Sequence, residues 1–126
     1  MTALLGSRAW RRLHAELDGD TVLLIRFLRS ATDLLLVRAG RVRLAAEAGD
    51  ADGLHEALLS LRSSADMTGA ARIVEAVGRV DDALGSGPAT SAALADLLGV
   101  VVRTDGVARR AWARHDRGSV PGAANR

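Results

Sequence analysis

The chain has 126 residues and a net charge of +2; its apolar residues are mostly Leu, Val and Ala, and its aromatic ones are Trp10, Phe27 and Trp112. A single domain of this length can bury most of its unfolded surface without a disulfide or a structural metal. The absence of cysteine excludes a disulfide framework and thiol chemistry, and the small charge does not by itself indicate a polyanionic partner.

The first predicted helix runs from about Ser7 to Leu17, where Trp10, Leu13 and Leu17 share one stripe. Asp20 is a suitable N-cap for a second, long helix from about Thr21 to Ala48. Apolar residues recur along that helix at spacings of three and four, with one gap near Arg38: Leu24, Phe27, Leu28, Ala31, Leu35, Val42 and Ala45.

Gly49 ends the second helix, and Asp50 or Asp52 caps a third one that extends to a break at Thr68-Gly69. One face of this third helix is apolar: Leu54, Ala57, Leu58, Leu61 and Ala65. The stripe of a fourth helix follows, with Ala76 beside it: Ile73, Val77, Val80 and Leu84.

A loop, Gly85-Ser-Gly-Pro, precedes a fifth helix, which we expect to be capped by Thr90 or Ser91 and to end near Ala113. Its apolar stripe is Leu94, Leu97, Leu98, Val101 and Val102. We therefore expect one domain over residues 1–115 and a disordered tail over residues 116–126.

Short loops between long helices make neighbours antiparallel. The pattern predicts an all-α fold: an antiparallel, up-down four-helix bundle with a short extra N-terminal helix. The residues expected inside are Leu24, Phe27, Leu28, Leu58, Leu61, Ile73, Val77, Leu98 and Val101.

The segment from Leu59 to Ala70 resembles the signature of histidine-containing phosphotransfer (HPt) domains, H-x-L-K-G-x-x-x-x-x-G-A. The match holds at Leu61, Arg62 (for lysine), Gly69 and Ala70, whereas Leu59 stands where the phosphoryl-accepting histidine belongs. The surroundings are also similar: a phenylalanine lies within the preceding long helix, and Gly49-Asp50 comes nine residues before the acceptor position. The resemblance covers roughly residues 20–113 and implies a phosphotransfer scaffold without its reactive group.

The chemistry of the signature explains what is lost. An imidazole attacks an aspartyl phosphate because its pKa leaves a free lone pair near physiological pH, and a leucine has none. Arg62, three residues on, preserves a charge able to bind phosphate or carboxylate. Ser63 replaces the glycine that lets a partner approach the backbone, and it is still small.

Helical spacing places His55, Leu59, Arg62 and Asp66 on one stripe of the third helix, with Ser63 beside it. His55 lies one turn before Leu59, so it is either an ordinary surface histidine or a shifted phosphoacceptor. Leu59 either packs partly under a neighbouring side chain or forms the apolar centre of a contact surface.

Other sites are not indicated. No His, Cys, Asp or Glu cluster has metal-ligand spacing, no cofactor is implied, and no nucleophile–base pair predicts an enzyme. The basic segment from Arg109 to His115 complements a helix C-terminus rather than a nucleic acid. Charged residues interrupt every apolar run, so we expect no membrane span and a soluble, cytoplasmic protein.

The resemblance implies a phosphorelay signalling protein that docks on a response regulator receiver domain without conventional histidine phosphotransfer. The docking residues would be His55, Leu59, Arg62, Ser63 and Asp66. Two alternatives stay open: a phosphocarrier that uses His55, and a structural or oligomerising helical protein with Leu59 in a homodimer interface. An exposed stripe with Arg62 unpaired would favour receiver docking.

Overall fold

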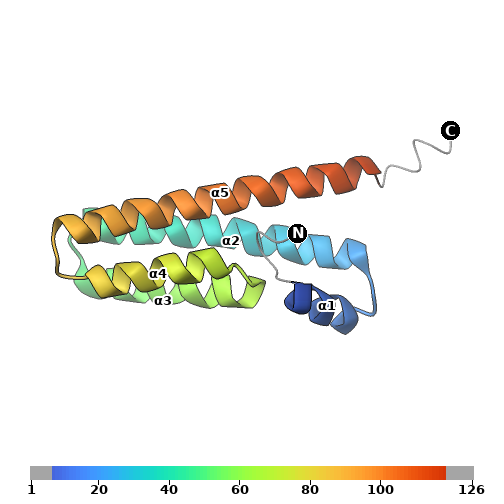
Figure 1. Cartoon of the computed structure of the whole chain (residues 1–126), viewed down its shortest axis with the longest axis horizontal. Helices are drawn as coiled ribbons and strands as arrows, with labels where there is room; N and C mark the ends of the chain where they lie inside the picture. The colour runs from blue at the N-terminus through green and yellow to red at the C-terminus, as the bar shows by residue number, and fades with distance from the viewer. Residues whose placement is uncertain (1–6, 119–126) are drawn as a thin grey trace.

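A computed structural model of the chain describes residues 7–118, which form five helices joined by short connections (Figure 1). The helices are α1 (Ser7–Glu16), α2 (Thr21–Glu47), α3 (Ala51–Thr68), α4 (Ala71–Ala83) and α5 (Pro88–Gly118). Over this range there is no strand, so the predicted all-helical fold is confirmed, and four of the five helices are the long ones expected. None of these helices is both long and apolar enough to cross a membrane.

The two longest helices, α2 and α5, lie side by side along the molecule (Figure 1). The shorter hairpin of α3 and α4 covers the half that holds the C-terminal part of α2 and the N-terminal part of α5. The helix α1 lies along the other half, next to the beginning of α2. The molecule therefore has two unlike halves, and the helix that carries the candidate site belongs to the hairpin.

Two of the predicted caps are confirmed, because each depends only on local geometry. The carboxylates of Asp20 and Asp50 accept backbone N–H groups three residues on, each at 2.9 Å, and so fix the starts of α2 and α3. Gly69 ends α3 in the left-handed conformation, with φ of 67°, which glycine adopts without steric penalty.

The predicted start of α5 is wrong, since the helix already begins at Pro88 rather than after Thr90 or Ser91. Proline suits the first helical position because its fixed φ is helical and it has no N–H to satisfy. The Thr90 hydroxyl instead donates back to the carbonyl of Ala83 at the end of α4. The cap residue expected for α5 therefore closes the loop between the two helices.

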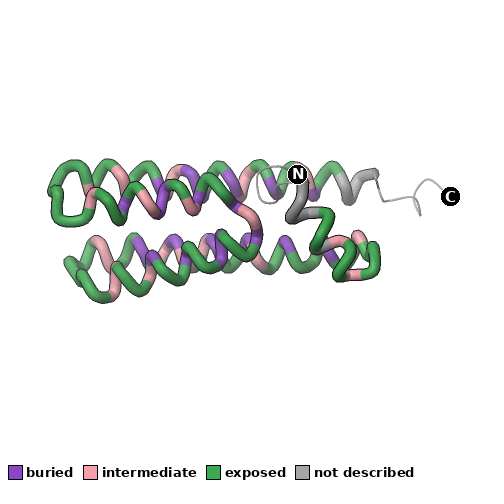
Figure 2. The backbone as a smooth tube through the Cα atoms, turned by 60° about the horizontal axis from the view of Figure 1, so that its bottom comes forward, coloured by how far each residue is buried: buried purple, intermediate pink, exposed green. Residues whose placement is uncertain are grey.

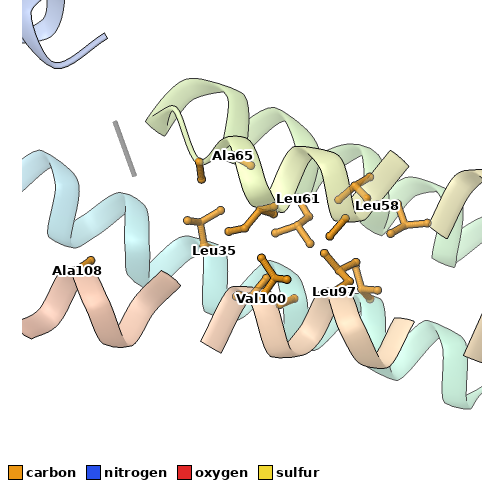
Figure 3. Packing of buried hydrophobic residues seen from close by; sticks show 14 of the residues in the cluster. Leu35, Leu58, Leu61, Ala65, Leu97, Val100 and Ala108 are labelled. Atoms are coloured by element: carbon orange, nitrogen blue, oxygen red, sulfur yellow. The ribbon is translucent and has the colours of Figure 1, made fainter. Parts of the chain in front are cut away.

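The core lies between the four long helices, and buried positions recur along all of them (Figure 2). Side chains from α2, α3 and α5 converge at its centre, among them Leu35, Leu61 and Leu97 (Figure 3). Seven of the expected core residues are buried: Leu24, Leu28, Leu58, Leu61, Ile73, Val77 and Val101.

Two expected core residues are not inside. Phe27 is 36% exposed, because Leu24 and Leu28 occupy the core face of α2 and turn Phe27 toward its outer edge. Leu98 is only partly buried, because its neighbour Leu97 is the fully buried residue of that turn. In both cases the residue next to the predicted one faces the core, because the helix has apolar residues on more than one side.

The far half of the molecule is held by contacts between α2 and the C-terminal part of α5. Trp112 is buried there, and the Arg29 guanidinium lies 5.9 Å from the centroid of its ring. Arg109 donates to Asp105 at 2.9 Å and to Asp33 of α2 at 2.6 Å. The hydrogen bonds to Asp105 and Asp33 raise the pKa of Arg109 above its ordinary value.

The expectations for the two ends of the chain can be compared with the structure only in part. The helix α5 continues to Gly118, so its expected end near Ala113 is too early and the expected boundary at residue 115 falls within it. Residues 119–126 lie outside the described residues. So do the side chains of Trp10 and Leu13, whose stripe with Leu17 stays a prediction.

Candidate docking surface

The residues that match the HPt signature divide into two groups in α3 and the turn after it. Leu61 is fully buried in the core, Gly69 forms the helix end, and Ala70 is buried behind it. These matched positions therefore contribute to packing and to the turn. The positions where chemistry would occur, Leu59 and Arg62, are both on the surface.

All five residues expected to dock a partner lie exposed on the outer side of α3: His55, Leu59, Arg62, Ser63 and Asp66. We call these five residues the docking stripe. Leu59 is 51% exposed, so it does not pack under a neighbouring side chain. The structure thus brings the predicted site residues together on one accessible face.

An unpaired Arg62 was expected to favour receiver docking, but Arg62 is paired. Its Nε lies 4.0 Å from Oδ2 of Asp66, one helical turn on, and both side chains are more than half exposed. Exposed pairs of this spacing contribute little to stability, so a partner's carboxylate can replace Asp66 at small cost.

His55 belongs to the docking stripe, whereas His14 lies on another helix. His55 is exposed seven positions before Arg62, about 10 Å along the helix axis. His14 lies in α1, where its ring hydrogen bonds the Thr21 hydroxyl at 3.2 Å. The side chain of His115 lies outside the described residues. Among the side chains that the structure describes, no three His, Cys, Asp or Glu residues are grouped to hold a metal ion.

Arg38 of α2 fixes the position of α3 from the side opposite the docking stripe. Its Nη1 donates to the backbone carbonyl of Ser60 at 2.9 Å and to the buried hydroxyl of Ser64. Sequence reasoning missed this contact, although the gap in the apolar pattern of α2 at Arg38 was its signal. A basic residue at an otherwise apolar position indicates a polar partner on the facing helix.

A shallow hollow of about 310 Å³ adjoins the Asp66 end of the docking stripe, at the turn between α3 and α4. Its lining residues are Ala65, Asp66, Gly69, Ala71, Val74 and Glu75. Two carboxylates and apolar side chains line it, so it does not suit an anionic group. The exposed face of Leu59 and Arg62 is the better candidate for a protein contact.

Comparison of the chain with family models, with curated proteins and with solved structures found no match.

Proposed function

We propose that this protein is an HPt-like signalling protein that docks on a response regulator receiver domain without relaying phosphate through a conventional histidine. In this proposal the four long helices form the antiparallel up-down bundle of that family, and α1 is the extra N-terminal helix. The observation that carries the proposal is Leu59, half exposed at the acceptor position of α3, with Arg62 exposed on the next turn.

The docking stripe has the properties that such a contact needs. Loss of the imidazole removes phosphoryl transfer, but docking depends on the surrounding surface. Burying Leu59 against a partner contributes roughly 1.5–3 kcal/mol. The Arg62 guanidinium can then bind an acidic pocket of the receiver once it leaves Asp66.

Binding to receiver domains tests the proposal directly. The protein is used to capture receiver domains from its native cell extract, and the affinity of each captured domain is measured by titration calorimetry. Leu59→Asp should weaken binding at least tenfold, because it places a carboxylate against an acidic surface. The thermal midpoint should barely change, since the side chain is outside the core.

Val102→Asp is the matched control, because Val102 is also exposed but lies on α5. It should bind receiver domains like the parent chain. If Leu59→Asp combined with Arg62→Glu leaves every receiver interaction unchanged, the docking stripe is not the interface and the structural alternative is favoured.

A phosphotransfer assay distinguishes the proposal from the alternative in which His55 carries phosphate. Incubated with a phosphorylated receiver domain, the protein should gain no acid-labile phosphate. Labelling that His55→Ala abolishes would establish the shifted phosphocarrier instead. That result would contradict the proposal while leaving the docking surface in place.

A further inference from the structure

A second apolar stripe runs along α2 on the side turned away from the core. Its positions alternate at spacings of four and three residues: Leu23, Phe27, Ser30, Leu34, Val37, Arg41 and Leu44. The five large apolar members are between 36% and 61% exposed. Alternating spacings of three and four are those of a coiled-coil seam, which faces a partner helix. We call these seven residues the α2 seam.

A hollow of about 200 Å³ lies at the middle of the α2 seam. The α2 residues that line it are Phe27, Ser30, Ala31 and Leu34, and Ser64, Met67 and Thr68 line it from α3. Four residues spaced i, i+3, i+4 and i+7 form the hole that receives one side chain from a facing helix in coiled-coil packing. The small side chain of Ser30 leaves this hole open, and its walls are apolar.

We propose that the α2 seam from Leu23 to Arg41 is a homodimer interface, in which two copies of α2 pack antiparallel and each places Leu34 in the hollow of the other. With Leu34 opposite Ser30 of the second copy, Phe27 faces Val37 of the second copy, and each pair is repeated by the two-fold symmetry. Arg41 then lies at both ends of the contact, opposite Leu23, where its guanidinium reaches solvent.

Other pairings fit the same residues poorly. A parallel pairing in register sets Arg41 against Arg41 of the second copy and presents Ser30 to the hollow, which stays empty. An antiparallel pairing shifted by one heptad toward the C-terminus of α2 presents Arg41 to the hollow, whose exposed lining is mostly apolar. A shift by one heptad in the other direction leaves Val37 and Arg41 without a facing residue, because α2 begins at Thr21. In the proposed pairing, Asp33 flanks the symmetry axis, and Arg109 of the same chain already neutralises it at 2.6 Å.

The interface is short and separate from the docking stripe. From Leu23 to Arg41 the helix extends about 28 Å, so we expect a dimer that forms and dissociates with concentration rather than an obligate one. The docking stripe lies on the outer side of α3, and the dimer does not depend on the proposed receiver docking.

Sedimentation velocity over a wide concentration range is the first test. The parent chain should shift from monomer to dimer, and Leu34→Glu should remove the shift. Leu59→Glu, the same change at an exposed leucine of α3, should dimerise like the parent. Circular dichroism should show equal helix content in all three.

Three outcomes would overturn the proposal: a parent chain that stays monomeric throughout, dimerisation that survives Leu34→Glu, or dimerisation that Leu59→Glu abolishes. The last would place the interface on α3.

The chain has no cysteine, so a spin label attached at Leu44→Cys is the single label of each chain. Double electron–electron resonance then measures the distance between the two labels of a dimer. Leu44 lies beyond the last proposed contact. The proposed antiparallel pairing puts the two labelled positions about 36 Å apart along the helix axes, whereas the two registers shifted by one heptad put them about 26 Å or about 46 Å apart. Parallel helices would hold them about 10 Å apart. Any of these other distances would refute the proposed pairing.

Discussion

At the scale of single residues, Arg38 joins the two helices on which the candidate surface depends. Replacing it with leucine removes the donor to the Ser60 carbonyl and leaves the buried Ser64 hydroxyl without that partner. Hydrogen bonds to charged groups contribute about 1.5–3 kcal/mol. We expect Arg38→Leu to lower the free energy of unfolding by about that amount, measured by urea denaturation.

The control for this prediction is Arg43→Leu on the same helix. Among the described residues, Arg43 makes an exposed ion pair with Glu47, at 3.8 Å, so its loss should change stability by about 0.5 kcal/mol or less. Equal losses at the two positions would show that Arg38 acts through its general charge rather than through its bonds to α3.

At the scale of elements, Gly69 determines where α3 ends and how α4 follows. Its left-handed backbone lets the N–H of Ala70 donate to the carbonyl of Ala65 at 2.8 Å, which closes the helix end. Gly69→Ala should destabilise the protein by about 1–2 kcal/mol, because an L side chain is strained in this conformation. Thermal unfolding followed by circular dichroism measures the change.

The same substitution inside α4 should have the opposite sign. Gly78 has helical geometry, and a methyl group there would meet nothing within 4 Å apart from its chain neighbours and the nearby backbone of its own helix. Gly78→Ala should therefore stabilise the protein by about 0.5–1 kcal/mol, since alanine loses less backbone freedom. Destabilisation at both positions would mean that α4 does not tolerate a side chain on that face.

At the scale of the whole molecule, the half beyond the α3–α4 hairpin depends on few large side chains. Trp112 is the largest of the buried residues there. Trp112→Ala should cost about 3–5 kcal/mol in the free energy of unfolding, as expected for a buried aromatic residue. The exposed Val107 on the same stretch of α5 provides the comparison, and Val107→Ala should stay within about 0.5 kcal/mol. A small effect at Trp112 would show that this half contributes little to folding.

The sequence predicts best what depends on nearby residues. The caps at Asp20 and Asp50 and the end at Gly69 follow from local geometry. The Arg62–Asp66 pair also has an i, i+4 spacing that is visible in the sequence, although the pair itself was not predicted. The contact from Arg38 to α3 needed the tertiary structure, because its partners lie on another helix.

The placement of Phe27 illustrates a different limit. Along α2 both Leu24 with Leu28 and Leu23 with Phe27 follow helical spacing, so periodicity gives two apolar faces without ranking them. Only the packing of α3 and α5 decides which face becomes the core. The prediction of where α5 begins also failed because of a tertiary contact. The Thr90 hydroxyl donates to a carbonyl at the end of α4 instead of capping α5.

The order in which the helices pack also bears on how the chain folds. Each helix packs against its neighbour in sequence, and the contact between α2 and α5 is the principal one between helices distant in the chain. Neighbouring hairpins can form with little loop-closure entropy, whereas joining α2 to α5 closes a loop that contains α3 and α4. A chain built mainly from local contacts folds rapidly. We therefore expect the far half, which has no α3–α4 hairpin to assist it, to be completed last.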